Sequence, residues 1–180
     1  MGQKLEEVFQ ANEFIHQGNF LEFHRDRVLL PNGKTATREY IKHPGAVAAL
    51  PLLSDGSALL VKQFRYPTGQ TLLEIPAGKL EPGEDPVACI RRELAEETGY
   101  QPGELIHLAS VWTTPGFTDE IIHLYLATRL EPAFLERDAD EFLEILRLSK
   151  SELLDYLNNG TVVDGKTVLA VSLVEMKKLW

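Results

Sequence analysis

The segment 78–100, GKLEPGEDPVACIRRELAEETGY, carries the strongest structural signals in this chain. It begins as a glycine-rich loop, and its second half has helix signals at both ends. Asp85 can cap a helix whose first residue is Pro86, and Gly99 can end that helix in the left-handed conformation. The apolar residues between them share one face at i, i+3 and i+7 spacing: Val87, Ile90 and Leu94. The segment therefore predicts a short helix that packs against a core.

Three carboxylates lie on one side of this predicted helix: Glu93, Glu96 and Glu97. At about 100° per residue, they fall within a sector roughly 100° wide. Like charges at this spacing repel one another, so a purely structural helix gains nothing from them; a solvated helix face is the alternative interpretation. A divalent cation converts the repulsion into binding, and oxygen-only ligands suit Mg²⁺ or Mn²⁺. The pattern predicts a metal site for phosphate chemistry.

The same segment resembles the signature of the Nudix family, G-x5-E-x7-R-E-U-x-E-E-x-G-U, where U is a bulky apolar residue. Nine residues fill its specified positions, and only the last is less apolar than usual: Gly78, Glu84, Arg92, Glu93, Leu94, Glu96, Glu97, Gly99 and Tyr100. Enzymes of this family hydrolyse a nucleoside diphosphate linked to another group. The resemblance implies an α+β fold, an α/β/α sandwich with a mixed sheet. Glu84 and Arg92 are expected to form a structural ion pair between loop and helix.

Three segments outside this box resemble the ADP-ribose pyrophosphatase subgroup of the family. They are residues 63–67 (QFRYP), 74–78 (EIPAG) and 113–120 (TTPGFTDE). The resemblance implies that four residues of these segments bind substrate: Arg65, Glu74, Pro115 and Gly116. The planar guanidinium of Arg65 suits phosphate oxygens. The alternatives are a surface arginine at a strand end and, at Pro115-Gly116, a simple turn between strands.

The resemblance also assigns metal ligands within the box. Glu93 and Glu97 are the first choices, Glu96 is the next, and the backbone carbonyl of Ala77 completes the set. Glu96 and Glu97 are therefore also counted among the catalytic residues. Bridging metal ions withdraw charge from a pyrophosphate and lower the pKa of a bound water. The expected cofactor is Mg²⁺, with Mn²⁺ as the alternative ion.

The general base is expected on a loop beyond the box, in residues 138–144 (DADEFLE). In related enzymes an acidic residue of this loop often has that role. Alignment on the following strand favours Glu141, with Asp140 and Glu136 as rivals. A solvated acidic loop is an equal alternative, because a base must be identified by geometry before its pKa is considered.

Size and charge limit the classes of protein that the chain can represent. A chain of 180 residues predicts one catalytic domain, residues 44–180, preceded by a small antiparallel β-sheet segment, residues 1–43. The formal charge of −9 argues against nucleic-acid binding. The single Cys89 excludes an intrachain disulfide and a multi-cysteine zinc site. No apolar run reaches membrane-spanning length and no signal-peptide core is visible, so a cytoplasmic protein without membrane partners is expected.

Hydrophobic patterns predict the other elements. Residues 18–30 and 34–42 form an N-terminal hairpin, which is compatible with the subgroup's dimerisation sheet and implies a homodimer. Residues 45–53 and 57–64 form a second hairpin, and their nearly continuous apolar runs suit strands covered on both faces. The remaining elements are strands at 72–75, 105–113, 120–128 and 142–148, and helices at 151–158 and 167–177.

Together these features predict a Mg²⁺-dependent hydrolase that cuts ADP-ribose to AMP and ribose 5-phosphate. Other nucleoside diphosphate sugars are expected as further substrates. One alternative is a hydrolase that prefers GDP-mannose or ADP-glucose. Another is a non-catalytic sensor that binds ADP-ribose or a nucleotide sugar. Metal-dependent turnover separates the enzyme from the sensor.

Overall fold

The computed structural model describes residues 5–133, 135–136 and 141–180. The chain divides into two units. One contains the N-terminal region up to Gly45 together with the segment Trp112–Ile121. The other contains Ala46–Val111 and Ile122–Trp180. Within the described residues, no helix has the length and apolar character needed to cross a membrane.

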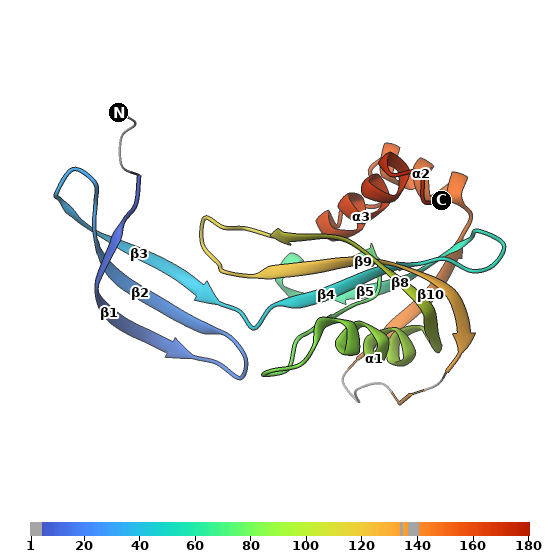
Figure 1. Ribbon diagram of the computed structural model, residues 1–180, viewed down its shortest axis with the longest axis horizontal. Coiled ribbons are helices and arrows are strands. Elements are labelled where there is room, and N and C mark those ends of the chain that lie inside the picture. The colour runs from blue at the N-terminus through green and yellow to red at the C-terminus, as the bar shows by residue number, and fades with distance from the viewer. Residues whose placement is uncertain (1–4, 134, 137–140) are drawn as a thin grey trace. The chain divides into compact units, whose positions relative to one another are not determined.

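The first unit contains a three-stranded antiparallel sheet, shown in blue in Figure 1. Its strands are β1 (Val8–Gln17), β2 (Glu22–Leu29) and β3 (Thr35–Lys42). The predicted hairpin is confirmed as β2 and β3, which are paired from Glu22–Lys42 to Leu29–Thr35. The turn between them places Gly33 at a φ of 80°, a conformation that favours glycine.

Sequence patterns missed β1. Its apolar residues come in adjacent pairs, Val8-Phe9 and Phe14-Ile15, and therefore do not alternate. Two register shifts explain this, one between Phe9 and Ala11 and the other between Phe14 and His16. A bulge adds one residue to a strand, so the two-residue period is broken at each shift.

The larger unit contains two further sheets. The four-stranded sheet has the order β7-β4-β9-β8 and the three-stranded sheet has the order β10-β5-β6. β4 is parallel to β9 and antiparallel to β7, so the central sheet is mixed, as predicted. The bounds are β4 (Ala46–Pro51), β5 (Ala58–Arg65), β6 (Gln70–Glu74), β7 (Ala77–Lys79), β8 (Tyr100–Trp112), β9 (Ile121–Pro132) and β10 (Leu143–Leu148), with a short 3-10 helix, η1 (Tyr66–Thr68), between β5 and β6.

The predicted hairpin of residues 45–53 and 57–64 is wrong. Both strands exist, but β4 pairs with β7 and β9 while β5 pairs with β10 and β6. Between the two segments, the structure has an isolated bridge from Leu52 to Ala58 and a turn hydrogen bond of 2.8 Å from Leu53 N to Ser57 O, but no ladder of paired residues. Strands that are apolar on both faces do not specify a partner, so the assembled core decides the pairing.

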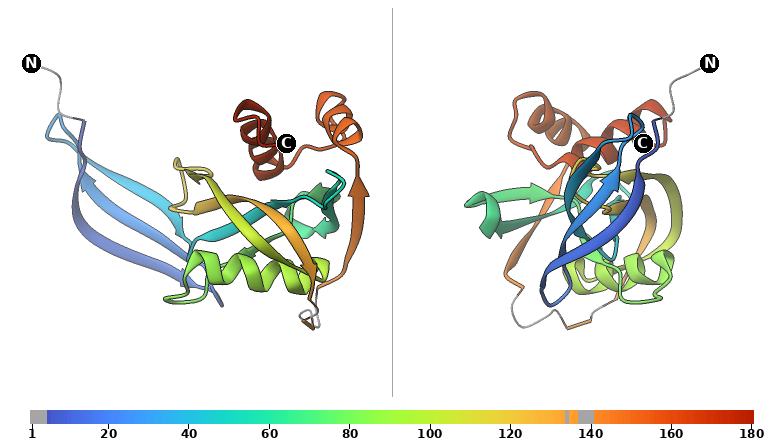
Figure 2. Two further views of the ribbon diagram at one scale, coloured as in Figure 1. Left: turned by 45° about the vertical axis from the view of Figure 1, so that its right-hand side comes forward. Right: turned by 90° about the vertical axis from the view of Figure 1, so that its left-hand side faces the viewer.

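The helices cover the central sheet from two sides, as Figure 2 shows. Their bounds are α1 (Pro86–Thr98), α2 (Lys150–Asn158) and α3 (Gly165–Met176). The residues of β4 alternate between two cores: Ala48 and Leu50 join the cluster that includes α2 and α3, while Val47 and Ala49 pack with α1. This alternation confirms the α/β/α sandwich.

The ends of α1 are built as predicted. Asp85 Oδ2 accepts a hydrogen bond from Ala88 N at 3.0 Å, and Gly99 ends the helix at a φ of 77°. Its buried face is shifted toward the C-terminus relative to the prediction. Ile90 and Leu94 are fully buried, but Val87 is 40% exposed because the buried face begins two residues later, at Cys89.

Candidate active site

Two of the predicted metal ligands are buried carboxylates on the inner face of α1. Glu93 is 7% exposed and Glu97 is 2% exposed. The carboxylate of Glu93 lies directly against Gly78, where an added Cβ would stand 1.9 Å from Glu93 Oε1. Ala77 N donates a hydrogen bond of 3.2 Å to Glu97 Oε2. The loop and the helix of the box therefore meet at these two side chains, and Gly78 is a glycine because a side chain would displace Glu93.

Burial and mutual repulsion destabilise the charged forms of both carboxylates. Burial, assisted by the charges of Glu96 and Glu141, raises the pKa of Glu93 to about 7, although Arg92 opposes the shift. Burial, together with Glu93 and Glu141, raises the pKa of Glu97 to about 8. A divalent cation at this position would remove the cause of both shifts, because it replaces lost hydration with direct ligation.

Arg92 is the positive charge closest to the cluster, and it is shared among three carboxylates. Its Nε lies 3.3 Å from Glu84 Oε1, which confirms the predicted loop–helix ion pair. Its Nη1 lies 2.8 Å from Glu93 Oε1 and 3.0 Å from Glu96 Oε2. Glu96 is therefore turned toward Arg92.

The donor set fits a hard divalent ion, since it consists of carboxylate and carbonyl oxygens. Among residues 5–133, 135–136 and 141–180, the structure has no group of three or more acidic, histidine or cysteine side chains that is arranged to bind a metal ion. Burial and mutual repulsion nevertheless raise the pKa of both Glu93 and Glu97, and a cation bound between them would relieve both effects. Ligation by this pair, with Glu96 and the Ala77 carbonyl, stays a prediction.

The structure brings Glu141 to the same cluster. Its side chain is half-buried, and its charge contributes to the raised pKa of both Glu93 and Glu97. Its rival Glu136 is exposed and contributes to neither shift. Asp140, the other rival, lies outside the described residues. The role of general base stays a prediction, with Glu141 favoured by its position.

Arg65 and Glu74 form a pair at the ends of β5 and β6. Arg65 Nε and Nη2 donate to Glu74 Oε1 and Oε2, both at 2.8 Å. Glu74 is 1% exposed, and the Lys166 ammonium from α3 binds the same carboxylate. Sequence reasoning missed Lys166, because its helix lies about ninety residues further along the chain and no motif marks it.

Pro115 and Gly116 lie in the loop between β8 and β9, in the unit that holds the N-terminal sheet. The loop turns through a hydrogen bond from Phe117 N to Thr114 O at 3.1 Å. A Cβ at Gly116 would meet no atom within 4 Å, so sterics do not require glycine there. Their part in substrate binding stays a prediction.

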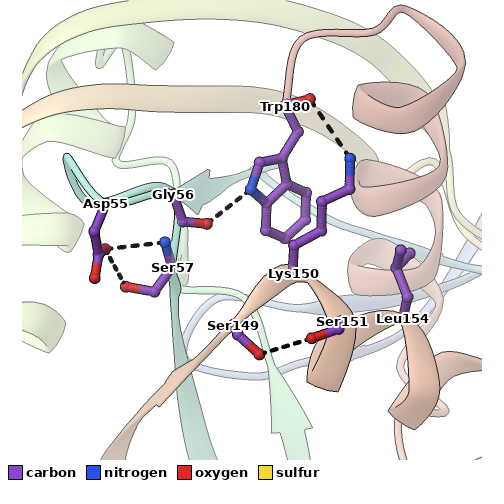
Figure 3. Close-up of a pocket in the computed structure, with 8 residues that line it drawn as sticks. All are labelled: Asp55, Gly56, Ser57, Ser149, Lys150, Ser151, Leu154 and Trp180. Atoms are coloured by element: carbon purple, nitrogen blue, oxygen red, sulfur yellow. Dashed lines mark hydrogen bonds between the residues drawn. The ribbon is translucent and has the colours of Figure 1, made fainter.

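A hollow of about 600 Å³ in the larger unit is lined by residues that lie outside the box (Figure 3). Its polar groups mainly bind one another: Trp180 Nε1 donates to Gly56 O at 2.7 Å, and Asp55 Oδ1 accepts from Ser57 N and Oγ. None of the predicted site residues lines it. The buried carboxylates therefore stay the candidate active site.

Comparison with known proteins establishes the family. The sequence model of the NUDIX domain matches residues 42–168, well over half of the chain. The protein belongs to the Nudix family. Its fold also matches a solved structure described as an ADP compounds hydrolase, with a TM-score of 0.86 over 98% of this chain and 96% of that one, at 22% sequence identity. This likeness confirms the Nudix fold. Because the two sequences are only 22% identical, it is evidence for the fold alone.

Two relatives align over nearly the whole of this Nudix chain. The ADP-ribose pyrophosphatase of Bacillus subtilis is 42% identical over 178 residues, which cover 98% of this chain and 96% of the relative. The methanol dehydrogenase activator of Bacillus methanolicus is 42% identical over 180 residues, which cover 99% and 97%. The family and these relatives identify the protein as a Nudix hydrolase, an enzyme that acts on phosphoanhydride bonds and uses divalent metal ions.

Proposed function

We propose that this Nudix hydrolase is a Mg²⁺-dependent pyrophosphatase that cuts ADP-ribose to AMP and ribose 5-phosphate. It also accepts other nucleoside diphosphate sugars. The observation that carries the proposal is the pair Glu93 and Glu97, two buried carboxylates in contact with the box loop whose pKa values are raised by burial and by each other's charge. The name of the Bacillus subtilis relative, which aligns from end to end, supports ADP-ribose as the substrate.

In this mechanism the box residues and Glu141 have separate tasks. Glu93, Glu97, Glu96 and the Ala77 carbonyl would hold the metal. A bound divalent ion would polarise the phosphate oxygens and make the attacking water more acidic. Glu141 would take the proton from the attacking water, and the effect of its charge on the pKa of Glu93 and Glu97 supports this role.

Substrate binding is the task of a second group of residues. Arg65 binds the diphosphate of the substrate, since its side chain is 39% exposed beyond its contact with Glu74. Glu74, which is buried, contributes to substrate binding by holding Arg65. Pro115 and Gly116 select the group linked to it. The supporting observation for this pair is their resemblance to the ADP-ribose pyrophosphatase subgroup.

A regulatory function is the second candidate. The Bacillus methanolicus relative is named as an activator of another enzyme and is as similar to this chain as the pyrophosphatase is. A protein of this kind that bound ADP-ribose without cleaving it would correspond to the sensor considered above. The cluster of acids favours the enzyme, because a sensor gains nothing from buried metal ligands.

A substrate panel tests the proposal. ADP-ribose, GDP-mannose, ADP-glucose, UDP-glucose and diadenosine polyphosphates are compared by kcat/KM with Mg²⁺ and then with Mn²⁺. ADP-ribose is expected to give the highest value and to release AMP. The double variant Glu93→Gln with Glu97→Gln is expected to be inactive, whereas Glu104→Gln, at an exposed acid paired with Arg129, keeps full activity. If kcat/KM is higher for GDP-mannose than for ADP-ribose, GDP-mannose is the preferred substrate. If the protein binds ADP-ribose without releasing AMP, it is a sensor.

We also propose a catalytic domain of residues 44–180 and a homodimer formed through the N-terminal segment 1–43. The sheet of β1, β2 and β3 exposes several large apolar side chains, among them Val8, Phe9, Phe14 and Phe23. Exposed apolar groups of this density are typical of protein interfaces. Sedimentation velocity should give twice the mass of the chain, and Phe9→Ser with Phe14→Ser should give the monomer.

A further inference from the structure

The carboxylate of Glu74 is held by two cations from elements that are far apart in the sequence, β5 and α3. Arg65 binds both of its oxygens from β5, with two contacts of 2.8 Å. The Lys166 ammonium, in the first turn of α3, binds Oε2. All of this occurs at a carboxylate that is 1% exposed. Glu74 therefore has no conformational freedom while both cations are present.

Lys166 is itself fixed by the N-terminus of its helix. Its Nζ lies 3.0 Å from Asp164 Oδ1, and both side chains are about 15% exposed. Asp164 Oδ2 caps α3 by accepting hydrogen bonds from Thr167 N at 3.0 Å and from Thr167 Oγ1 at 2.6 Å. A capped first turn holds its side chains in one place.

The same turn also holds the chain that leads into the box. Thr167 Oγ1 accepts a hydrogen bond of 2.8 Å from Ile75 N, and both residues are fully buried. Ile75 directly follows Glu74 and is two residues before Ala77, whose N–H binds Glu97. The first turn of α3 thus connects the Arg65–Glu74 pair with the loop beside the carboxylate cluster.

The contacts of Lys166 fix the orientation of Arg65. Arg65, Glu74, Lys166 and Asp164 together carry two positive and two negative charges, so the group is neutral as a whole. The effect of Lys166 is therefore geometric: it holds Glu74, and Glu74 holds the guanidinium of Arg65 in one orientation. A side chain that is already held in one orientation lowers the entropy cost of substrate binding.

We propose that Lys166 is a positioning residue for substrate binding: it acts through Glu74 to orient Arg65 toward the diphosphate. This inference rests on the proposed function of Arg65. It assigns no contact between Lys166 and the substrate. Loss of the ammonium therefore weakens substrate binding without slowing the chemical step.

The test compares Lys166→Met with the wild type in two assays. The Kd for ADP-ribose is measured by calorimetry in EDTA, where turnover is blocked, and KM and kcat are measured with Mg²⁺. We expect Kd and KM to rise about tenfold, a typical coupling between residues in contact, while kcat stays within about twofold. Lys62→Met is the matched control, because Lys62 forms an exposed ion pair with Glu144, and its Kd should not change.

The background variant Arg65→Lys separates positioning from direct contact. If Lys166 acts through Arg65, Lys166→Met should cause no further rise in Kd once Arg65 is changed. A further tenfold rise would show direct contact with the substrate and overturn the inference. An unchanged Kd for Lys166→Met in the wild-type background would also overturn the inference. The role of Lys166 would then be limited to the stability of the fold.

Two further outcomes are distinguished by the same measurements. If Lys166→Met does not fold, Lys166→Gln replaces it, because glutamine removes the charge but still donates a hydrogen bond to Glu74. A wild-type protein that neither cleaves nor binds ADP-ribose would overturn the proposed function and this inference together. A wild type that does both, with Lys166→Met unchanged, would overturn this inference alone.

Discussion

Replacing Gly78 by alanine should disable the metal site while leaving the fold intact. The added Cβ would stand 1.9 Å from Glu93 Oε1 and from its Cδ. A normal carbon–oxygen contact is about 3.3 Å, so the carboxylate must retreat by roughly 1.4 Å (3.3 − 1.9). A displacement of about 1 Å in a catalytic group can cost about 10²-fold in rate, and we expect at least that loss in kcat.

The cost to stability should be smaller than the cost to activity. Overpacking typically costs about 1–3 kcal/mol, and in a domain of this size each kcal/mol lowers Tm by about 2–4 °C. We therefore expect Tm to fall by roughly 2–12 °C. Gly165→Ala is the matched control, because a Cβ at Gly165 meets no atom within 4 Å.

The assays are AMP release from ADP-ribose and calorimetric titration with Mn²⁺, both on protein that is folded by circular dichroism. Gly78→Ala is expected to lose both activity and cation affinity, while Gly165→Ala keeps both. If folded Gly78→Ala keeps the kcat and the Mn²⁺ affinity of the wild type, then the Glu93 carboxylate can bind the metal after it has been displaced by the added Cβ. The steric argument for the box glycine would then be refuted.

Four other predictions concern single side chains. The pKa of Glu97 is raised from 4.5 to about 8, so its protonated carboxyl stabilises the metal-free fold most below pH 4.5, and this contribution is lost as pH rises toward 8. Tm measured in EDTA should therefore fall from pH 4.5 to pH 8, and it should fall less steeply in Glu97→Gln. Added Mg²⁺ should restore Tm at pH 8. Glu141→Gln should lower kcat roughly 10²–10⁴-fold while Glu136→Gln has no effect, and a reversed result would make Glu136 the base. Arg65→Lys should raise KM for ADP-ribose about tenfold, since lysine cannot replace the planar fork, and an unchanged KM would remove Arg65 from substrate binding. Burial raises the pKa of the Cys89 thiol to about 12. Cys89 should therefore resist alkylation at pH 8 in the native protein and react once the protein is unfolded in guanidinium, as measured by mass spectrometry. Rapid labelling of the native protein would contradict the burial of Cys89.

Local signals in the sequence predicted the box helix well. Asp85, Pro86 and Gly99 mark its ends because capping and left-handed backbone depend on neighbouring residues alone. The Glu84–Arg92 pair could be predicted for the same reason, since loop and helix are adjacent in the chain. The other strands of the larger unit were also visible, because apolar runs of that length predict buried strands. The exception is β7 (Ala77–Lys79), which was missed because it is only three residues long and includes the first glycine of the predicted loop.

Long-range contacts could not be read from the same patterns. The partners of β4 and β5 were wrongly predicted as each other, since both strands are apolar on two faces and either could pair with several neighbours. β1 was missed, because two bulges remove its alternation.

The sequence by itself determined the Nudix family and the helix that carries its box, because these depend on residue types at fixed short spacings. Only the tertiary structure showed that the charge of Glu141 acts on Glu93 and Glu97, and that Lys166 shares Glu74 with Arg65. The residues of each group are separated by about forty to ninety positions along the chain. Both groups form through the packing of the sheets and helices: burial raises the pKa of Glu97, and the two cations hold Glu74 in place.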